Sequence, residues 1–200
     1  MFSEVEHTRA QGHSNPVKSD ENDRNRERLI RLLQMAYSGE LAAAHAYRGH
    51  WKSVRNADER RKIKSIEEEE LQHRAWVGEM LAELGNGPSP EREAKMGRIG
   101  RTIGFLCRIS GWLIPMYGAG RLESTNIKEY EDAALYAAGC GCASFVPRLI
   151  QMAEVEWDHE FYFRTKVLSH FLGRRIPLWT LPPPKDGIRK RLETIIPISD

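Results

Sequence analysis

Two Glu-x-x-His motifs combine residue types and a spacing that suit metal binding. Glu70 and His73 form one motif, and Glu156 and His159 form the other. On an α-helix, side chains three positions apart point to the same side, so each pair can hold one metal ion. A single Glu-x-x-His on a charged helix is common by chance, and its side chains are then simply solvated. The surroundings of the two motifs decide between these interpretations.

Apolar residues at helical spacing place both motifs on faces that should be buried. They lie four and seven positions before each glutamate and seven positions after it. Burying an ionised carboxylate without a partner costs several kcal/mol, so a Glu and a His at the centre of such a face indicate a cation between them. We expect that cation to be a metal ion. The apolar neighbours are Ile63, Ile66, Val77 and Met80 for the first motif, and Leu149, Met152 and Phe163 for the second.

Two further carboxylates occupy equivalent positions on other segments. Glu40 has small or apolar residues four and seven positions away on both sides, and Glu123 has a similar set of neighbours. Glu131 is the rival of Glu123, but it belongs to the acidic run 129–132, which is typical of an outward face. The predicted metal ligands are therefore Glu40, Glu70, His73, Glu123, Glu156 and His159.

Four long amphipathic helices must position these ligands. Hydrophobic periodicity predicts them over about 26–54, 58–84, 116–138 and 144–173, with Asp58 as the N-cap of the second and Gly85 at its end. The short first connection makes the first two helices antiparallel. With no convincing strand pattern, the sequence predicts an all-α four-helix bundle. We expect it over residues 26–173, with a disordered N-terminal arm over 1–25 and a Pro-containing C-terminal tail over 174–200.

The apolar run 103–117 has two interpretations. It contains Gly residues and Pro115, so it is too interrupted for a transmembrane helix. The run either caps the open end of the bundle or rests on a membrane, with Trp112 and Tyr117 at the interface and Arg108 toward lipid phosphates. The sequence leaves both open.

Composition limits the partners and the compartment. The formal net charge of +2 is too small for the basic field that nonspecific nucleic-acid binding needs, so we expect no nucleic-acid partner. Three cysteines without a CxxC pair argue against a disulfide framework or a zinc ribbon. The first residues contain no apolar signal-peptide core. We expect a cytoplasmic protein, which a contact through 103–117 would place peripherally on the inner face of the membrane.

One Glu from each of two helices and one Glu-x-x-His from each of the other two is the ligand pattern of ferritin-like di-iron and di-manganese bundles. Four carboxylates and two divalent ions would give a site close to neutral in a core of low dielectric constant. Nitrogen and oxygen ligands without a thiolate suit iron or manganese. We expect two iron ions, with manganese as the alternative.

The sequence also resembles the demethoxyubiquinone hydroxylase family over about residues 28–170. The resemblance implies a carboxylate-bridged di-iron monooxygenase that uses O2 and an electron donor to hydroxylate a hydrophobic quinone precursor. This chain departs from the family at 35–38, where the usual Asp-His-Ala before Gly-Glu is absent, and in a longer, more basic segment before the third helix. The matching features are Ser38-Gly39-Glu40 with Tyr47 seven residues on, Glu70 with His73, Glu123 with Tyr130 seven residues on, and Glu156 with His159.

Four other side chains near these ligands have less specific patterns. Tyr47 and Tyr130 are candidates for contacts with the ligands or for the wall of a substrate pocket, and the alternative is that both are core aromatics. His45 and His50 lie off the apolar stripe, so we expect surface histidines.

Two other functional classes stay open. The first is an iron- or peroxide-handling protein of the ferritin or rubrerythrin type, which uses nearly the same ligands. The absence of a CxxC pair argues against it, whereas the acidic run 67–69 could supply an extra inward carboxylate. The second is a metal-free structural bundle, which buried carboxylates disfavour. A long apolar cavity beside the ions would favour the hydroxylase, and a closed polar site the peroxidase. The sequence leaves the oligomeric state open.

Overall fold

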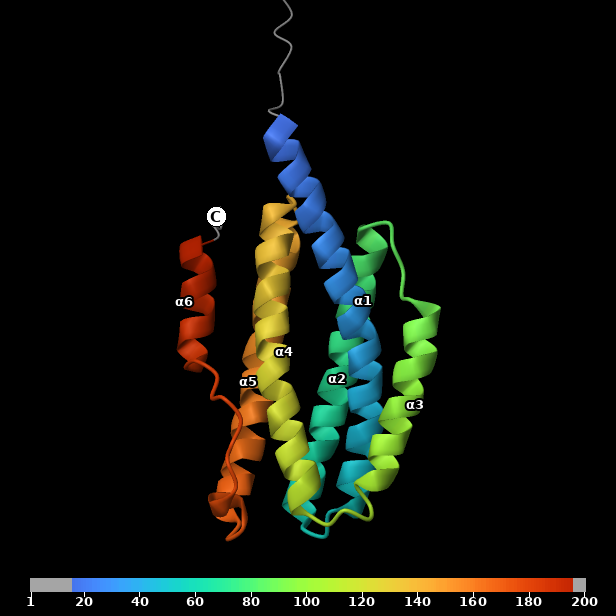
Figure 1. Cartoon of the computed structure of the whole chain (residues 1–200), viewed down its shortest axis with the longest axis vertical. Helices are drawn as coiled ribbons and strands as arrows, with labels where there is room; N and C mark the ends of the chain where they lie inside the picture. The colour runs from blue at the N-terminus through green and yellow to red at the C-terminus, as the bar shows by residue number, and fades with distance from the viewer. Residues whose placement is uncertain (1–15, 196–200) are drawn as a thin grey trace, which may run out of the picture.

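The computed structural model describes residues 16–195, which form six α-helices and no strand (Figure 1). The predicted all-α ferritin-like bundle is confirmed. Its helices are α1 (Pro16–Ser53), α2 (Ala57–Glu83), α3 (Pro90–Leu106), α4 (Leu113–Gly139), α5 (Val146–Ser169) and α6 (Lys185–Ile195).

Helices α1, α2, α4 and α5 form the bundle itself. α1 and α2 are antiparallel, and so are α4 and α5 (Figure 1). The chain crosses from one pair to the other through α3, so that α2 and α4 run in the same direction. One long crossover of this kind is typical of ferritin-like bundles.

Helix α2 begins one residue after a side-chain cap. The Asn56 side chain accepts hydrogen bonds from the backbone N–H groups of Asp58 and Glu59, at 2.9 and 3.0 Å. The predicted cap, Asp58, was wrong because this residue already lies in the first helical turn, where its negative charge favours the helix dipole. The predicted stop is confirmed at Gly85, whose φ of 66° suits a residue without Cβ.

Helix α1 is longer than its hydrophobic pattern indicated. The structure extends it to Pro16, so residues 16–25 are helical where a disordered arm was predicted. Polar contacts of Asn25 and Arg26 bind the adjoining turn of α1 to the ends of α4 and α2. The Asn25 amide donates to the Gly139 carbonyl, and the Arg26 guanidinium donates to the Leu84 carbonyl. Residues 1–15 of the predicted arm lie outside the described residues.

Helix α3 was missed by the hydrophobic pattern because it packs through glycines rather than through large apolar side chains. A Cβ at Gly100 would lie 2.5 Å from the backbone oxygen of Ala42, and one at Gly104 would lie 2.5 Å from that of His45. Only glycine permits so close an approach of two backbones. α3 therefore lies directly against α1 on the outside of the bundle (Figure 1).

Several large side chains of the apolar run 103–117 are exposed. Ile103, Phe105, Leu106, Ile109 and Ile114 all expose at least 43% of their surface. No helix within residues 16–195 has both the length and the apolar character needed to cross a bilayer.

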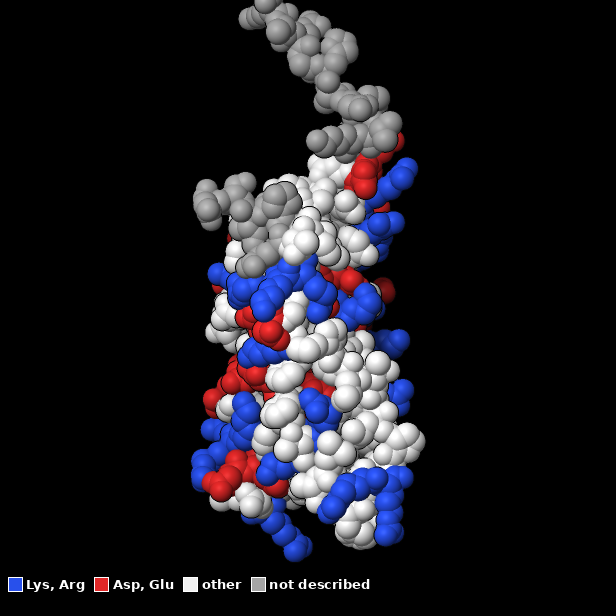
Figure 2. All heavy atoms as spheres, turned by 90° about the vertical axis from the view of Figure 1, so that its left-hand side faces the viewer, with Lys and Arg blue, Asp and Glu red and all other residues white. Residues whose placement is uncertain are grey.

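The C-terminal segment lies on the outside of α4 and α5. Trp179 is buried there and donates from its indole N–H to Glu160. The segment ends in α6, which the sequence pattern did not indicate and which buries Ile188 and Leu192. Basic and acidic side chains intermix on this side of the molecule (Figure 2), as in the pair of Arg189 with Glu154. Residues 196–200 of the predicted tail lie outside the described residues.

A polar layer divides the core of the bundle into two apolar clusters. Along each of the four bundle helices, residues of one cluster lie on one side of a buried acidic residue and residues of the other cluster lie on the other side. On α1, for example, Leu33 and Ala43 belong to different clusters and Glu40 lies between them. The four helices thus bring their acidic residues to one level.

Candidate metal centre

All six predicted ligand residues lie in this polar layer. Each is buried, and Glu40, with 4% of its surface exposed, is the most accessible. They form two overlapping groups in which one ligand atom of every member lies within 4.8 Å of the others. Glu70 and Glu156 belong to both groups. Glu40 and His73 complete the first group, and Glu123 and His159 complete the second.

Both histidines turn the same ring nitrogen toward the acidic residues. Nδ1 of His159 lies 3.4 Å from carboxylate oxygens of Glu70 and Glu156, and Nδ1 of His73 lies 2.9 Å from Glu156. The other nitrogen of His159, Nε2, lies 2.5 Å from Glu69. A carboxylate on the far side of a ligating histidine fixes the orientation of the ring and raises its basicity.

The polar atoms at the centre of the cluster lack hydrogen-bond partners among the described residues. Such buried atoms are rare in folded proteins because each carries a desolvation penalty. Converging carboxylate oxygens and imidazole nitrogens are the donor set that a hard or borderline divalent cation prefers. The residues therefore fit metal ions. The atoms are Glu40 Oε2, His73 Nδ1, His159 Nδ1 and both carboxylate oxygens of Glu70 and Glu156.

The pKa values show how unfavourable the cluster is without a cation. Burial and neighbouring carboxylates raise the pKa of Glu40 and of Glu123 well above the ordinary range, and they raise that of Glu70 to about 7. The pKa of Glu156 is lowered instead, because His159 and His73 outweigh the effect of its burial. Four ionised carboxylates at this depth thus need positive charge between them.

Two tyrosines bind the carboxylates of the opposite helices. The Tyr47 hydroxyl on α1 donates to Glu123 on α4, and the Tyr130 hydroxyl on α4 donates to Glu40 on α1. Each tyrosine follows a glutamate by seven residues, and the two helices are antiparallel, so the arrangement has an approximate twofold symmetry. Tyr47 and Tyr130 are therefore in contact with predicted ligands and are more than core aromatics.

The structure places Glu123 in the cluster and Glu131 outside it. Glu123 is fully buried in the cluster, where Asn126 also donates to it at 2.9 Å. Glu131 is partly buried and pairs with Arg191 of α6. Metal binding by Glu123 remains a prediction, and so does metal binding by the other five residues.

Sequence reasoning missed the roles of Glu67 and Glu69, although the acidic run 67–70 was the available signal. Glu67 is buried and accepts from Arg48 and from the Trp51 indole, at 2.7 and 2.6 Å. Glu69 accepts from or shares a proton with His159. Neither belongs to the two ligand groups, so neither is the extra inward carboxylate that a peroxide-handling site would use.

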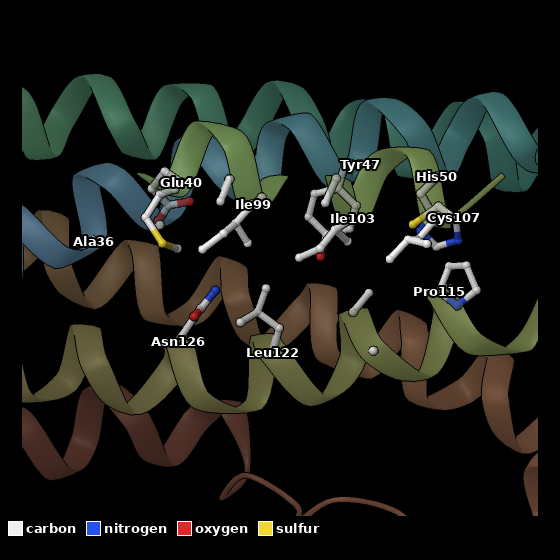
Figure 3. Close-up of a pocket in the computed structure, with 18 of the residues that line it drawn as sticks. Ala36, Glu40, Tyr47, His50, Ile99, Ile103, Cys107, Pro115, Leu122 and Asn126 are labelled. Atoms are coloured by element: carbon white, nitrogen blue, oxygen red, sulfur yellow. The ribbon is translucent and has the colours of Figure 1, made fainter. Parts of the chain in front are cut away.

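An apolar cavity of about 560 Å³ adjoins the cluster between α1, α3 and α4. Glu40, Tyr47 and Tyr130 contribute to its wall, and most of the remaining lining is aliphatic. Figure 3 shows Glu40 near one end, Tyr47 in the middle and His50 near the other end. This apolar lining suits a hydrophobic ligand. Other lining residues include Ala43, Ile99, Ile103, Ile114 and Leu122.

His50 is buried, so its prediction as a surface histidine was wrong. Only 1% of its surface is exposed, because Phe163 of α5 stacks on its ring with centroids 6.0 Å apart. His50 follows Tyr47 by three residues and therefore shares its helix face. His45, by contrast, is half-buried.

Comparison with known proteins is consistent with this site. Residues 27–112, which include Glu40, Glu70 and His73, match the model of a family described as "Ubiquinone biosynthesis protein COQ7". The chain is 33% identical over 67 residues to a 3-demethoxyubiquinol 3-hydroxylase of Aromatoleum aromaticum, covering 34% of this chain and 32% of the relative. It is 32% identical over 76 residues to the enzyme of that name from Francisella philomiragia, covering 38% and 36%.

The matched region is short. The chain spans about a third of the length of the curated relatives that it matches. No solved structure shows a significant match. The predicted resemblance to the demethoxyubiquinone hydroxylase family is nevertheless confirmed by both the family model and these relatives.

Proposed function

We propose that this chain, which resembles the demethoxyubiquinone hydroxylases, uses O2 to hydroxylate a quinone precursor or a similar hydrophobic aromatic molecule at a centre of two iron ions. One observation carries the proposal: two buried ligand groups that share Glu70 and Glu156 adjoin an apolar cavity through Glu40, Tyr47 and Tyr130.

The two ions would be held by the two groups of ligands. Glu40 and His73 would bind one ion, Glu123 and His159 the other, and the two shared carboxylates both. When bound, iron supplies the electron exchange with O2 that no side chain of the cluster can perform. Glu69 orients the His159 ring, since it contacts the nitrogen that faces away from the cluster.

The apolar wall suits the substrate class. A cavity of about 560 Å³ lies within the usual range for small-molecule sites, and aliphatic side chains line it next to the cluster. Such a wall would hold an aromatic ring close to the cluster and exclude water from the reacting atoms. In the reaction, one atom of O2 enters an aromatic C–H bond to give C–OH. The other atom leaves as water, with two electrons and two protons from an electron donor.

A ferritin- or rubrerythrin-like function is less favoured. An iron- or peroxide-handling site needs small polar substrates to reach the ions, whereas the cavity beside this cluster is apolar. The carboxylates that could have added a polar ligand, Glu67 and Glu69, contact Arg48 and His159 instead.

The exposed apolar run suggests how such a substrate reaches the cavity. Ile103, Leu106 and Ile114 both line the cavity and expose apolar surface beside Phe105 and Ile109. We propose that this edge rests on a membrane that holds the substrate. Replacing Phe105 and Ile109 with glutamate should then abolish co-sedimentation with anionic phospholipid vesicles. Unchanged co-sedimentation would contradict the membrane contact.

The activity is tested by isotope incorporation. Iron-loaded, reduced protein is mixed with 18O2 and a short-tailed demethoxyubiquinol, and the product is analysed by mass spectrometry. We expect one 18O atom in the product ring. Glu156→Gln, which changes a shared ligand, should abolish the product, whereas Glu154→Gln should not, because Glu154 pairs with Arg189 at the surface. No labelled product from the wild-type protein would refute the proposed hydroxylation.

A further inference from the structure

His50 is a buried polar group that the proposed reaction does not yet use. Its Nε2 atom has no hydrogen-bond partner among the described residues, although the side chain lines the apolar cavity. Burial lowers the pKa of His50 to about 4, so the imidazole is neutral near pH 7. A buried polar atom without a partner is unfavourable, and its presence in a cavity wall indicates that a ligand supplies the partner.

His50 lies beside Tyr47, which contacts the cluster of predicted metal ligands. Its ring lies 6.5 Å from the Tyr47 ring and 6.0 Å from the Phe163 ring, centroid to centroid. Tyr47 in turn donates to Glu123. Glu40 lies ten residues earlier on α1, about 15 Å along the helix axis. His50 therefore lies beyond Tyr47 from Glu40, toward the other end of the cavity (Figure 3).

The chemistry of the cavity limits what His50 can bind. A neutral imidazole has one donor and one acceptor nitrogen, so it can donate to a ring carbonyl or accept from a ring hydroxyl. Its neighbours Cys107 and Pro115 in this end of the cavity offer no comparable group (Figure 3). An uncharged aromatic ligand with an oxygen substituent fits both the largely apolar wall and the unpaired His50 nitrogen.

We propose that His50 is a specificity-determining residue, whose imidazole forms a hydrogen bond to a ring oxygen of a phenol- or quinone-type ligand in this cavity. This inference rests on the proposed function and adds to it the group that distinguishes an oxygenated ring from a plain hydrocarbon. A site that hydrogen-bonds a ligand oxygen rejects the analogue that lacks it, because the buried group is then left unpaired.

Two probes that differ by one oxygen test the proposal. Binding of 4-butylphenol and of butylbenzene to the full-length protein is measured by isothermal titration calorimetry. The test variant is His50→Phe, which keeps a ring beside Tyr47 and Phe163 but removes both nitrogens, with His50→Leu as a second variant if it does not fold. His50→Gln restores a polar group, and His45→Gln is the control on the same helix outside the cavity.

We expect His50→Phe to weaken binding of 4-butylphenol about tenfold and to leave butylbenzene unchanged or tighter. His50→Gln should stay within about threefold of the wild type for both probes, and His45→Gln should have no effect. Equal changes for the two probes would show a packing effect and overturn the inference. If the wild type binds neither probe, both this inference and the proposal that the cavity binds a hydrophobic ligand are refuted. If the difference appears but no 18O is incorporated, the hydroxylase proposal fails and the role of His50 stands.

Discussion

Without bound metal, the fold should lose stability as the pH rises from mildly acidic to neutral and above. Without a cation, Glu40, Glu70 and Glu123 have raised pKa values in the folded chain, so the folded state keeps protons that the unfolded state releases. Stability from such groups is fully present below the pKa of the unfolded chain and is lost as the pH rises through the folded pKa. The raised pKa values of His73 and His159 act in the same direction.

Glu70 sets the size of the effect. Its pKa rises from 4.5 to about 7 on folding, and each pKa unit corresponds to about 1.4 kcal/mol. This one residue should therefore make the metal-free fold about 3 kcal/mol less stable above pH 7 than below pH 4.5. That is a large part of the 5 to 15 kcal/mol that is roughly typical of whole domains. The lowered pKa of Glu156 matters only at more acidic pH, outside this window.

Urea unfolding followed by circular dichroism measures this difference. Chelator-treated protein should lose stability between about pH 5 and pH 8, and protein with bound metal should not. Glu70→Gln should remove about 3 kcal/mol of that dependence from the metal-free protein. Glu68→Gln should remove none, because Glu68 lies at the surface beside Lys64. A metal-free wild type that is equally stable across this range would refute the argument from buried carboxylates.

The other predictions concern single residues. Glu123→Gln should lower the iron content measured by atomic absorption, and Glu131→Gln should not, because Glu131 pairs with Arg191 outside the cluster. His159→Ala should lose at least one ion while circular dichroism shows an intact bundle, and full occupancy would exclude His159 as a ligand. Gly100→Ala should cost about 1 to 3 kcal/mol in urea unfolding, since its Cβ would meet the α1 backbone. Gly97→Ala, with room for a Cβ, should cost nothing.

The convergence of the six residues of the cluster could be predicted because they interrupt strong hydrophobic patterns. Each of the four bundle helices has large apolar residues at helical spacing, so a glutamate in the middle of the buried face is conspicuous. The same reasoning placed Glu123 rather than Glu131 in the cluster, as the structure does. The periodicity of one helix thus carries the information about which of its side chains point inward.

Features that depend on contacts between distant segments could not be predicted in this way. Helix α3 packs through Gly100 and Gly104, which contribute no hydrophobic period. His50 is buried by Phe163, which is more than a hundred residues away in the sequence. Glu69 contacts His159 across the bundle. The acidic run 67–70 alone does not indicate which of its four glutamates makes this contact.

We propose that the cluster holds two metal ions, with Glu70 and Glu156 as ligands of both. Anomalous diffraction at the iron edge, from crystals of the iron-loaded full-length protein, tests it most directly. We predict two peaks roughly 3.5 to 4 Å apart, one beside His73 and the other beside His159, with the two shared carboxylates between them. A single peak, or iron bound elsewhere with the cluster empty, would refute the two-ion site.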